Sequence, residues 1–139
     1  MIDNTVYLQI TAPKPHQRII GKLMMRLGIL YYDENKIPFE PFPETMIDEN
    51  QTSPTPDILL YDNETKTNQI IIEVTGNTGL RKDIEKVKQL VEDYGVPEGF
   101  VYNYNTGKWY KYQLGKGEDI DTPSFSHLLH FDLDKLLDR

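Results

Sequence analysis

A run of β-branched residues in the middle of the chain, QIIIEVT at 69–75, most constrains what this sequence can fold into. Its alternation predicts a strand with two different faces. One face carries Ile70, Ile72 and Val74, and the other carries Ile71, Glu73 and Thr75. A carboxylate inside such an apolar strand is costly to bury unless it is paired or holds a metal ion. The segment is therefore predicted to be both a core strand and part of a functional site.

A second apolar strand, DILLY at 57–61, precedes this run and is separated from it by a polar turn of hairpin length. In a β-hairpin the start of one strand faces the end of the next, so Asp57 and Glu73 are expected side by side at one end of the sheet. Two adjacent carboxylates repel each other, and a divalent cation relieves the repulsion. Mg²⁺, or Mn²⁺ in its place, commonly takes one or two carboxylates, main-chain carbonyls and waters. The carbonyl of Val74 is a natural third ligand.

The remaining patterns predict an α/β or α+β protein with one mixed sheet and flanking helices. Strands are expected at 5–11, around 39–47, at 99–104, at 108–114 and at 128–131, and helices at 14–30, 80–94 and 132–137. The prolines in this region confine that strand to a sheet edge or a bulge. Gly95 ends the second helix, and Asp132 caps the last one. Alternation along the 99–114 hairpin predicts that Tyr102 and Trp109 lie on different faces.

Composition narrows the function classes. A chain of 139 residues is expected to form a single domain, 1–139. Fifteen basic against 22 acidic residues give a net charge of −7, so a nucleic-acid ligand would need a local basic strip or metal ions. The absence of cysteine excludes disulfides, thiolate zinc sites and cysteine nucleophiles. Short apolar runs predict no membrane span, and the amino-terminal pattern is not a secretory signal, so a cytoplasmic location is expected.

A lysine near the two carboxylates would complete a hydrolytic site by orienting water or neutralising the transition state. The strand position two residues after Glu73 is Thr75, which cannot do this. Lys82, Lys86 and Lys88 open the following helix, and the first two share a helical face. The competing interpretation is that these lysines form a solvated helix face.

These residues resemble a known group of enzymes. The run PDILLYD…QIIIEVT is similar to the PD-(D/E)XK nuclease superfamily, in which a Pro-Asp precedes an acidic residue in an apolar strand. More narrowly, the chain resembles the restriction-endonuclease-like domains of the Uma family. The supporting pieces follow the family order over residues 14–137: HQRI at 16–19, PD at 56–57, EV at 73–74, RKD at 81–83, GVPE at 95–98 and the ending LLHFDLDKLLDR.

The resemblance implies a restriction-endonuclease-like mixed sheet and a metal-dependent nuclease that cleaves DNA, often as a homodimer. Asp57 and Glu73 would hold Mg²⁺ or Mn²⁺, and Lys86 would be a migrated catalytic lysine, with Lys88 and Lys82 as competitors. His16 would approach the site from the first helix. The chain departs from the family in carrying Thr75 in place of the strand lysine. It also lacks the acidic residue on the first helix, for which Glu40 or Glu44 would have to substitute.

Three hypotheses follow. The first is a metal-dependent nuclease that uses Asp57, Glu73 and a helix lysine, with Lys86 preferred. The second is a catalytically inactive relative that binds nucleic acid or protein, which the acidic balance and the missing strand lysine favour. The third is a structural homodimer formed through the aromatic hairpin at 99–114.

Overall fold

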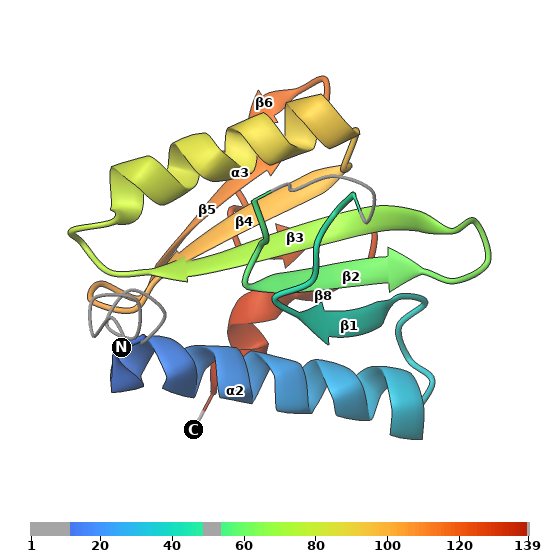
Figure 1. Cartoon of the computed structure of the whole chain (residues 1–139). Helices are drawn as coiled ribbons and strands as arrows, with labels where there is room; N and C mark the ends of the chain where they lie inside the picture. The colour runs from blue at the N-terminus through green and yellow to red at the C-terminus, as the bar shows by residue number, and fades with distance from the viewer. Residues whose placement is uncertain (1–11, 49–53, 139) are drawn as a thin grey trace, which may run out of the picture.

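The computed structural model describes residues 12–48 and 54–138, and a six-stranded mixed sheet organises them (Figure 1). The strands lie in the order β1-β2-β3-β4-β5-β6. Only the central β3/β4 pair is parallel, and the other neighbouring pairs are antiparallel. The bounds are β1 Glu40–Pro43, β2 Ile58–Asp62, β3 Thr67–Thr75, β4 Glu98–Asn103, β5 Lys108–Gln113 and β6 Gly117–Glu118.

Two helices cover opposite faces of this sheet (Figure 1). Helix α2, Lys14–Gly28, packs with Ile70, Ile72 and Val74 in one apolar cluster. Helix α3, Leu80–Tyr94, connects β3 to β4 and packs with Ile71 in the other cluster. The predicted alternation along the central strand is therefore confirmed, because even-numbered side chains face α2 and odd-numbered ones face α3. The predicted α+β class, a mixed sheet flanked by helices, is confirmed as well.

A local signal explains where α3 ends, whereas the end of α2 differs from the prediction. The prediction for α3 is confirmed at both ends, and Gly95 terminates it with φ of 66°, a left-handed conformation that costs glycine little. Helix α2 was expected to reach Leu30. The structure ends it at Gly28 and continues the chain as a π-helical turn, Ile29–Asp33.

The carboxyl-terminal part differs from the prediction. A strand at 128–131 is wrong, because residues 127–130 form a turn between two short strands, β7 Phe125–Ser126 and β8 Phe131–Asp132. The final helix is a 3₁₀ helix, Leu133–Leu137, and Asp132 caps it as predicted by accepting from the Asp134 N–H. The strand expected at 5–11 lies outside the described residues. No helix in the described ranges is both long enough and apolar enough to cross a bilayer.

The aromatic hairpin is also arranged differently from the prediction. Tyr102 and Trp109 are directly paired in the β4/β5 register, and their ring centroids lie 4.9 Å apart. Directly paired residues of antiparallel strands point to the same face, so both rings face α2. The prediction that Tyr102 and Trp109 lie on different faces was wrong, because it used the alternation within each strand and not the register between the two strands.

Candidate functional site

Strand pairing places Asp57 and Glu73 next to each other. The β2/β3 register pairs Ile58 with Ile72, so Asp57, which directly precedes β2, lies beside Glu73. Glu73 is on the face of β3 that α3 covers and is only 2% exposed, whereas the Asp57 side chain is 16% exposed. β3 ends and β2 begins at the same edge of the sheet (Figure 1). The two carboxylates therefore lie next to each other at this edge.

Main-chain hydrogen bonds lock the two acids together. The Asp57 N–H donates to Glu73 Oε2 at 3.0 Å, and the Val74 N–H donates to Asp57 Oδ2 at 2.8 Å. Each carboxylate therefore accepts a bond from the other strand's backbone. These bonds and the hairpin register fix the two carboxyl groups next to each other.

A lysine and a histidine side chain approach this pair from the two helices. Lys86 of α3 forms an ion pair through Nζ with Glu73 Oε1, and the same Nζ donates to the Thr55 carbonyl at 2.8 Å. His16, in the first turn of α2, places Nε2 3.3 Å from Asp57 Oδ2. Its Nδ1 is buried and has no hydrogen-bond partner among the residues that the structure describes. The sequence could not predict the contact between Lys86 and Thr55, because every residue carries a main-chain carbonyl.

The environment of Glu73 makes its ionised form costly. Burial and, to a smaller extent, the charge of Asp57 raise the pKa of its carboxyl to about 8, against the opposing effect of the ion pair with Lys86. A strongly shifted carboxyl beside a charged partner is a feature of functional sites, although structural ion pairs produce it too.

Several expected residues lie elsewhere. Lys88 does not join the site, because its Nζ is 3.7 Å from Glu85 and lies over the Tyr112 ring. Glu40 is at the far end of β1, where it accepts hydrogen bonds from Tyr32 and Asn63.

Glu44 reaches the site edge only through its backbone, whose N–H donates to the Asp57 carbonyl. In the described ranges, no group of three or more His, Asp or Glu side chains is placed to hold a metal ion. The potential protein ligands are therefore the two carboxylates and main-chain carbonyls.

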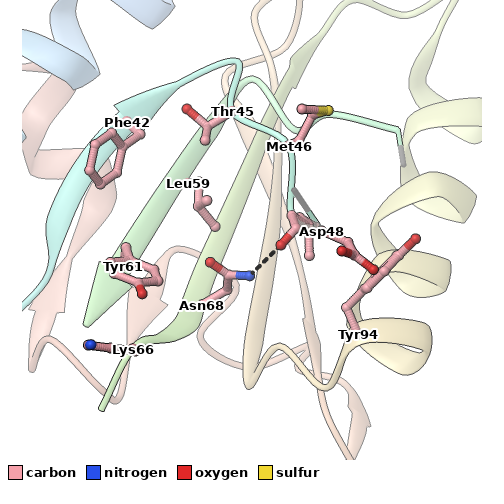
Figure 2. Close-up of a pocket in the computed structure, with 10 residues that line it drawn as sticks. Phe42, Thr45, Met46, Asp48, Leu59, Tyr61, Lys66, Asn68 and Tyr94 are labelled. Atoms are coloured by element: carbon pink, nitrogen blue, oxygen red, sulfur yellow. Dashed lines mark hydrogen bonds between the residues drawn. The ribbon is translucent and has the colours of Figure 1, made fainter. Parts of the chain in front are cut away.

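A separate pocket of about 480 Å³ lies on the α3 side of β1 and β2, away from the carboxylate pair (Figure 2). Its floor is formed by Phe42, Leu59 and Tyr61, and Tyr94 closes it at the end of α3. Neither Asp57 nor Glu73 lines it. The candidate site therefore lies outside this pocket, where the end of β3 meets the start of β2.

Comparison with known proteins supports this architecture. No protein-family model matches the chain, and no curated protein matches it. The structure is similar to the crystal structure of a putative nuclease belonging to DUF820 from Anabaena variabilis ATCC 29413, with a TM-score of 0.59 and 15% sequence identity. The similarity covers 91% of this chain and 82% of that one. At this identity it establishes a shared fold, and membership of the Uma family stays a prediction.

Proposed function

We propose that this protein is a divalent-metal-dependent nuclease domain that hydrolyses phosphodiester bonds of DNA at the Asp57–Glu73 edge. The observation that carries the proposal is the buried carboxylate of Glu73, held beside Asp57 in the central strand of the sheet. A buried acidic residue at this position disfavours folding, so a functional role is the better explanation for its presence. The fold shared with a protein described as a putative nuclease supports the same conclusion.

The residues present fit a hard divalent cation. Asp57, Glu73 and the Val74 carbonyl would hold Mg²⁺ or Mn²⁺, which need few protein ligands and keep several waters. In a strand, the N–H and C=O of one residue point toward the same neighbour, so the Val74 carbonyl faces the side on which its N–H meets Asp57. The β2/β3 register places Pro56 opposite Val74, and a proline has no N–H to occupy that carbonyl. A bound cation would supply an activated water and neutralise charge on the phosphate.

Lys86 and His16 supply the other functions. Lys86 has its ammonium at Glu73, where it can donate to a phosphoryl oxygen or orient a water. His16 contacts Asp57 from the opposite helix and is assigned as a positioning residue, since it holds the carboxylate in place. The helix lysine thereby takes the role that Thr75 cannot fill.

The test is cleavage of a labelled DNA duplex with Mn²⁺ by the parent, Asp57→Asn, Glu73→Gln and Lys86→Met. We expect at least about a 100-fold loss in each variant, because each removes a group that acts on the reacting phosphate. Matched controls are Glu85→Gln and Lys88→Met, which change the same charges on α3 outside the site and should keep parental rates. Parental cleavage by both Asp57→Asn and Glu73→Gln would refute the proposal.

A catalytically inactive binding module is the second candidate. It is favoured by Thr75 and by the internal contacts of the carboxylates with Lys86, His16 and the backbone. Calorimetric titration with Mn²⁺ or Mg²⁺ separates the nuclease from the binding module. The nuclease must bind the metal ion. A folded protein that shows no heat of binding up to millimolar metal is a binding module. A homodimer and a cytoplasmic location stay predictions, and light scattering tests the former.

A further inference from the structure

One side of helix α2 carries exposed apolar side chains. The residues of this helix that are buried in the core are Ile19, Ile20, Leu23 and Leu27. Met25 is 56% exposed, and Ile29 and Tyr32, in the π-helical turn that continues α2, are 40% and 60% exposed. Steps of four and three residues place these three side chains on one side of the helix. Because α2 lies on the outside of the molecule, this side faces away from the sheet (Figure 1).

The residues along this side are arranged symmetrically about Met25. Gly21 and Ile29 are four residues from Met25 in the two directions, and Arg18 and Tyr32 are seven residues from it. All five residues are exposed, and we call them the outer face of α2. A two-fold symmetric dimer needs a surface that is complementary to itself, because the same patch of both copies meets at the axis. The outer face has the required symmetry.

The two ends of this helical segment carry opposite charges. Lys14 and Arg18 are exposed in the first two turns of α2, and Asp33 and Glu34 are exposed at the end of the π-helical turn. In the part of the chain that the structure describes, Lys14, Arg18 and Asp33 form no ion pair. The cations lie near the positive pole of the helix dipole and the acids near its negative pole, so both are unfavourably placed within one chain. The opposite end of a second α2 would neutralise both groups.

We propose that the outer face of α2 packs antiparallel against the outer face of a second copy of this chain, with the two-fold axis at Met25. In this arrangement Arg18 lies near the partner's Asp33, and the positive pole of each helix lies beside the negative pole of the other. A parallel pair would instead place Arg18 against the partner's Arg18. Charge complementarity therefore selects the antiparallel pair.

Side-chain sizes fit the same arrangement. Because the positions are symmetric about Met25, Gly21 lies opposite the partner's Ile29, and Arg18 lies opposite the partner's Tyr32. A Cβ on Gly21 would meet nothing within 4 Å in its own chain, so this position is open to the larger side chain of the partner. Glycine is a poor helix former, and the close approach gives it a role here. An arginine over a tyrosine ring adds a cation–π contact.

The contact is expected to be weak. One helix from each copy buries less than the ~800 Å² per partner that is typical of stable complexes, so we expect a Kd of roughly 10–500 μM. His16, through which α2 contacts Asp57, is not part of the outer face. The inference therefore goes beyond the proposed function and does not depend on metal binding or cleavage.

Sedimentation velocity over about 1–500 μM protein measures this association. Met25→Lys places two ammonium groups together at the two-fold axis and should weaken the dimer at least about 10-fold. The matched control is Met46→Lys, which makes the same change at an exposed methionine outside α2 and should keep the parental Kd. Thermal unfolding of each variant checks that the fold is retained.

A charge exchange tests the antiparallel register. Arg18→Asp and Asp33→Arg should each weaken the dimer about 5-fold, and the double variant should regain most of the parental association. Residues 18 and 33 lie about 20 Å apart along one helix, so only a contact between two copies can give this recovery.

A parent that stays monomeric up to about 500 μM would overturn the inference. Dimerisation of Met25→Lys with the Kd of Met46→Lys would overturn it too, because the dimer would then use another surface. A double charge variant no better than the single variants would exclude the antiparallel pair. Dimerisation that appears only after removal of residues 1–11 would assign the outer face to that segment instead.

Discussion

At the scale of single residues, Glu73 combines two opposed requirements. Its position in the central strand excludes water, which disfavours its charge, while Lys86 and the Asp57 N–H interact best with the ionised form. Asp57 lies close by and adds a like charge. A leucine here would remove this conflict, so the acid is better explained by binding than by stability.

The pH dependence of folding tests this conflict in metal-free protein. The pKa of Glu73 rises from 4.5 to about 8 on folding, mainly through burial. Between those values the folded chain keeps a proton that the unfolded chain has lost, so this group makes the free energy of unfolding fall as pH increases. Below 4.5 the contribution is fully present, and above about 8 it is lost.

Glu73→Gln removes this group, so its urea-unfolding free energy should decline less than the parent's across this window. The control Glu118→Gln, an exposed acid on β6, should follow the parent. The same decline in Glu73→Gln and parent would show that Glu73 does not titrate as inferred.

At the scale of elements, regular patterns were predictable and pairings beyond them were not. Helix α3 was predicted at both ends because an apolar stripe, a helix stop at Gly95 and a glycine-containing turn agree. The juxtaposition of Asp57 with Glu73 needed only the hairpin register. The faces of Tyr102 and Trp109 were misassigned because alternation was read without that register.

The carboxyl-terminal strands were misplaced for a different reason. The segment around β7 is held by Lys111. This side chain is fully buried, although lysine is usually exposed in proteins. Its partners come from distant parts of the chain, so no local pattern identifies them. The lysine of the candidate site was likewise left open among Lys82, Lys86 and Lys88, because choosing among them requires the packing angle of α3 on the sheet.

Packing of α3 on β4 depends on Gly99. A Cβ added there would overlap Val87 Cγ1 and lie 2.9 Å from Val91 Cγ2, so Gly99→Ala should destabilise the protein by about 1–3 kcal/mol through overpacking. The matched control is Gly21→Ala at an exposed position of α2, where an added Cβ would have no atom within 4 Å. It should stabilise by about 0.5–1 kcal/mol, because alanine favours helix. Denaturant unfolding measures both, and equal effects of the two substitutions would contradict this packing.

At the scale of the whole molecule, one buried polar network joins the carboxyl-terminal segment to the sheet. Lys111 of β5 is 3.4 Å from Glu98 of β4 and donates to the Phe125 carbonyl at 2.6 Å. Glu98 in turn accepts from the Ser126 hydroxyl at 2.6 Å and from the His127 N–H at 2.8 Å. Through these contacts the chain after β6 is attached to β4 and β5, away from the Asp57–Glu73 edge.

Breaking this network on one side should be more damaging than removing both charges. Lys111→Met leaves the Glu98 carboxylate buried without its cation and should cost about 3–5 kcal/mol of unfolding free energy. The double variant Lys111→Met/Glu98→Gln removes both charges and keeps hydrogen-bonding atoms for Ser126, so it should recover part of the loss. Urea unfolding of the single and double variants measures this coupling. Additive losses would mean that Lys111 and Glu98 stabilise the fold independently. Recovery would show that the buried charge of Glu98 is tolerated because Lys111 neutralises it, while Lys111 also has Asp119 at 3.7 Å.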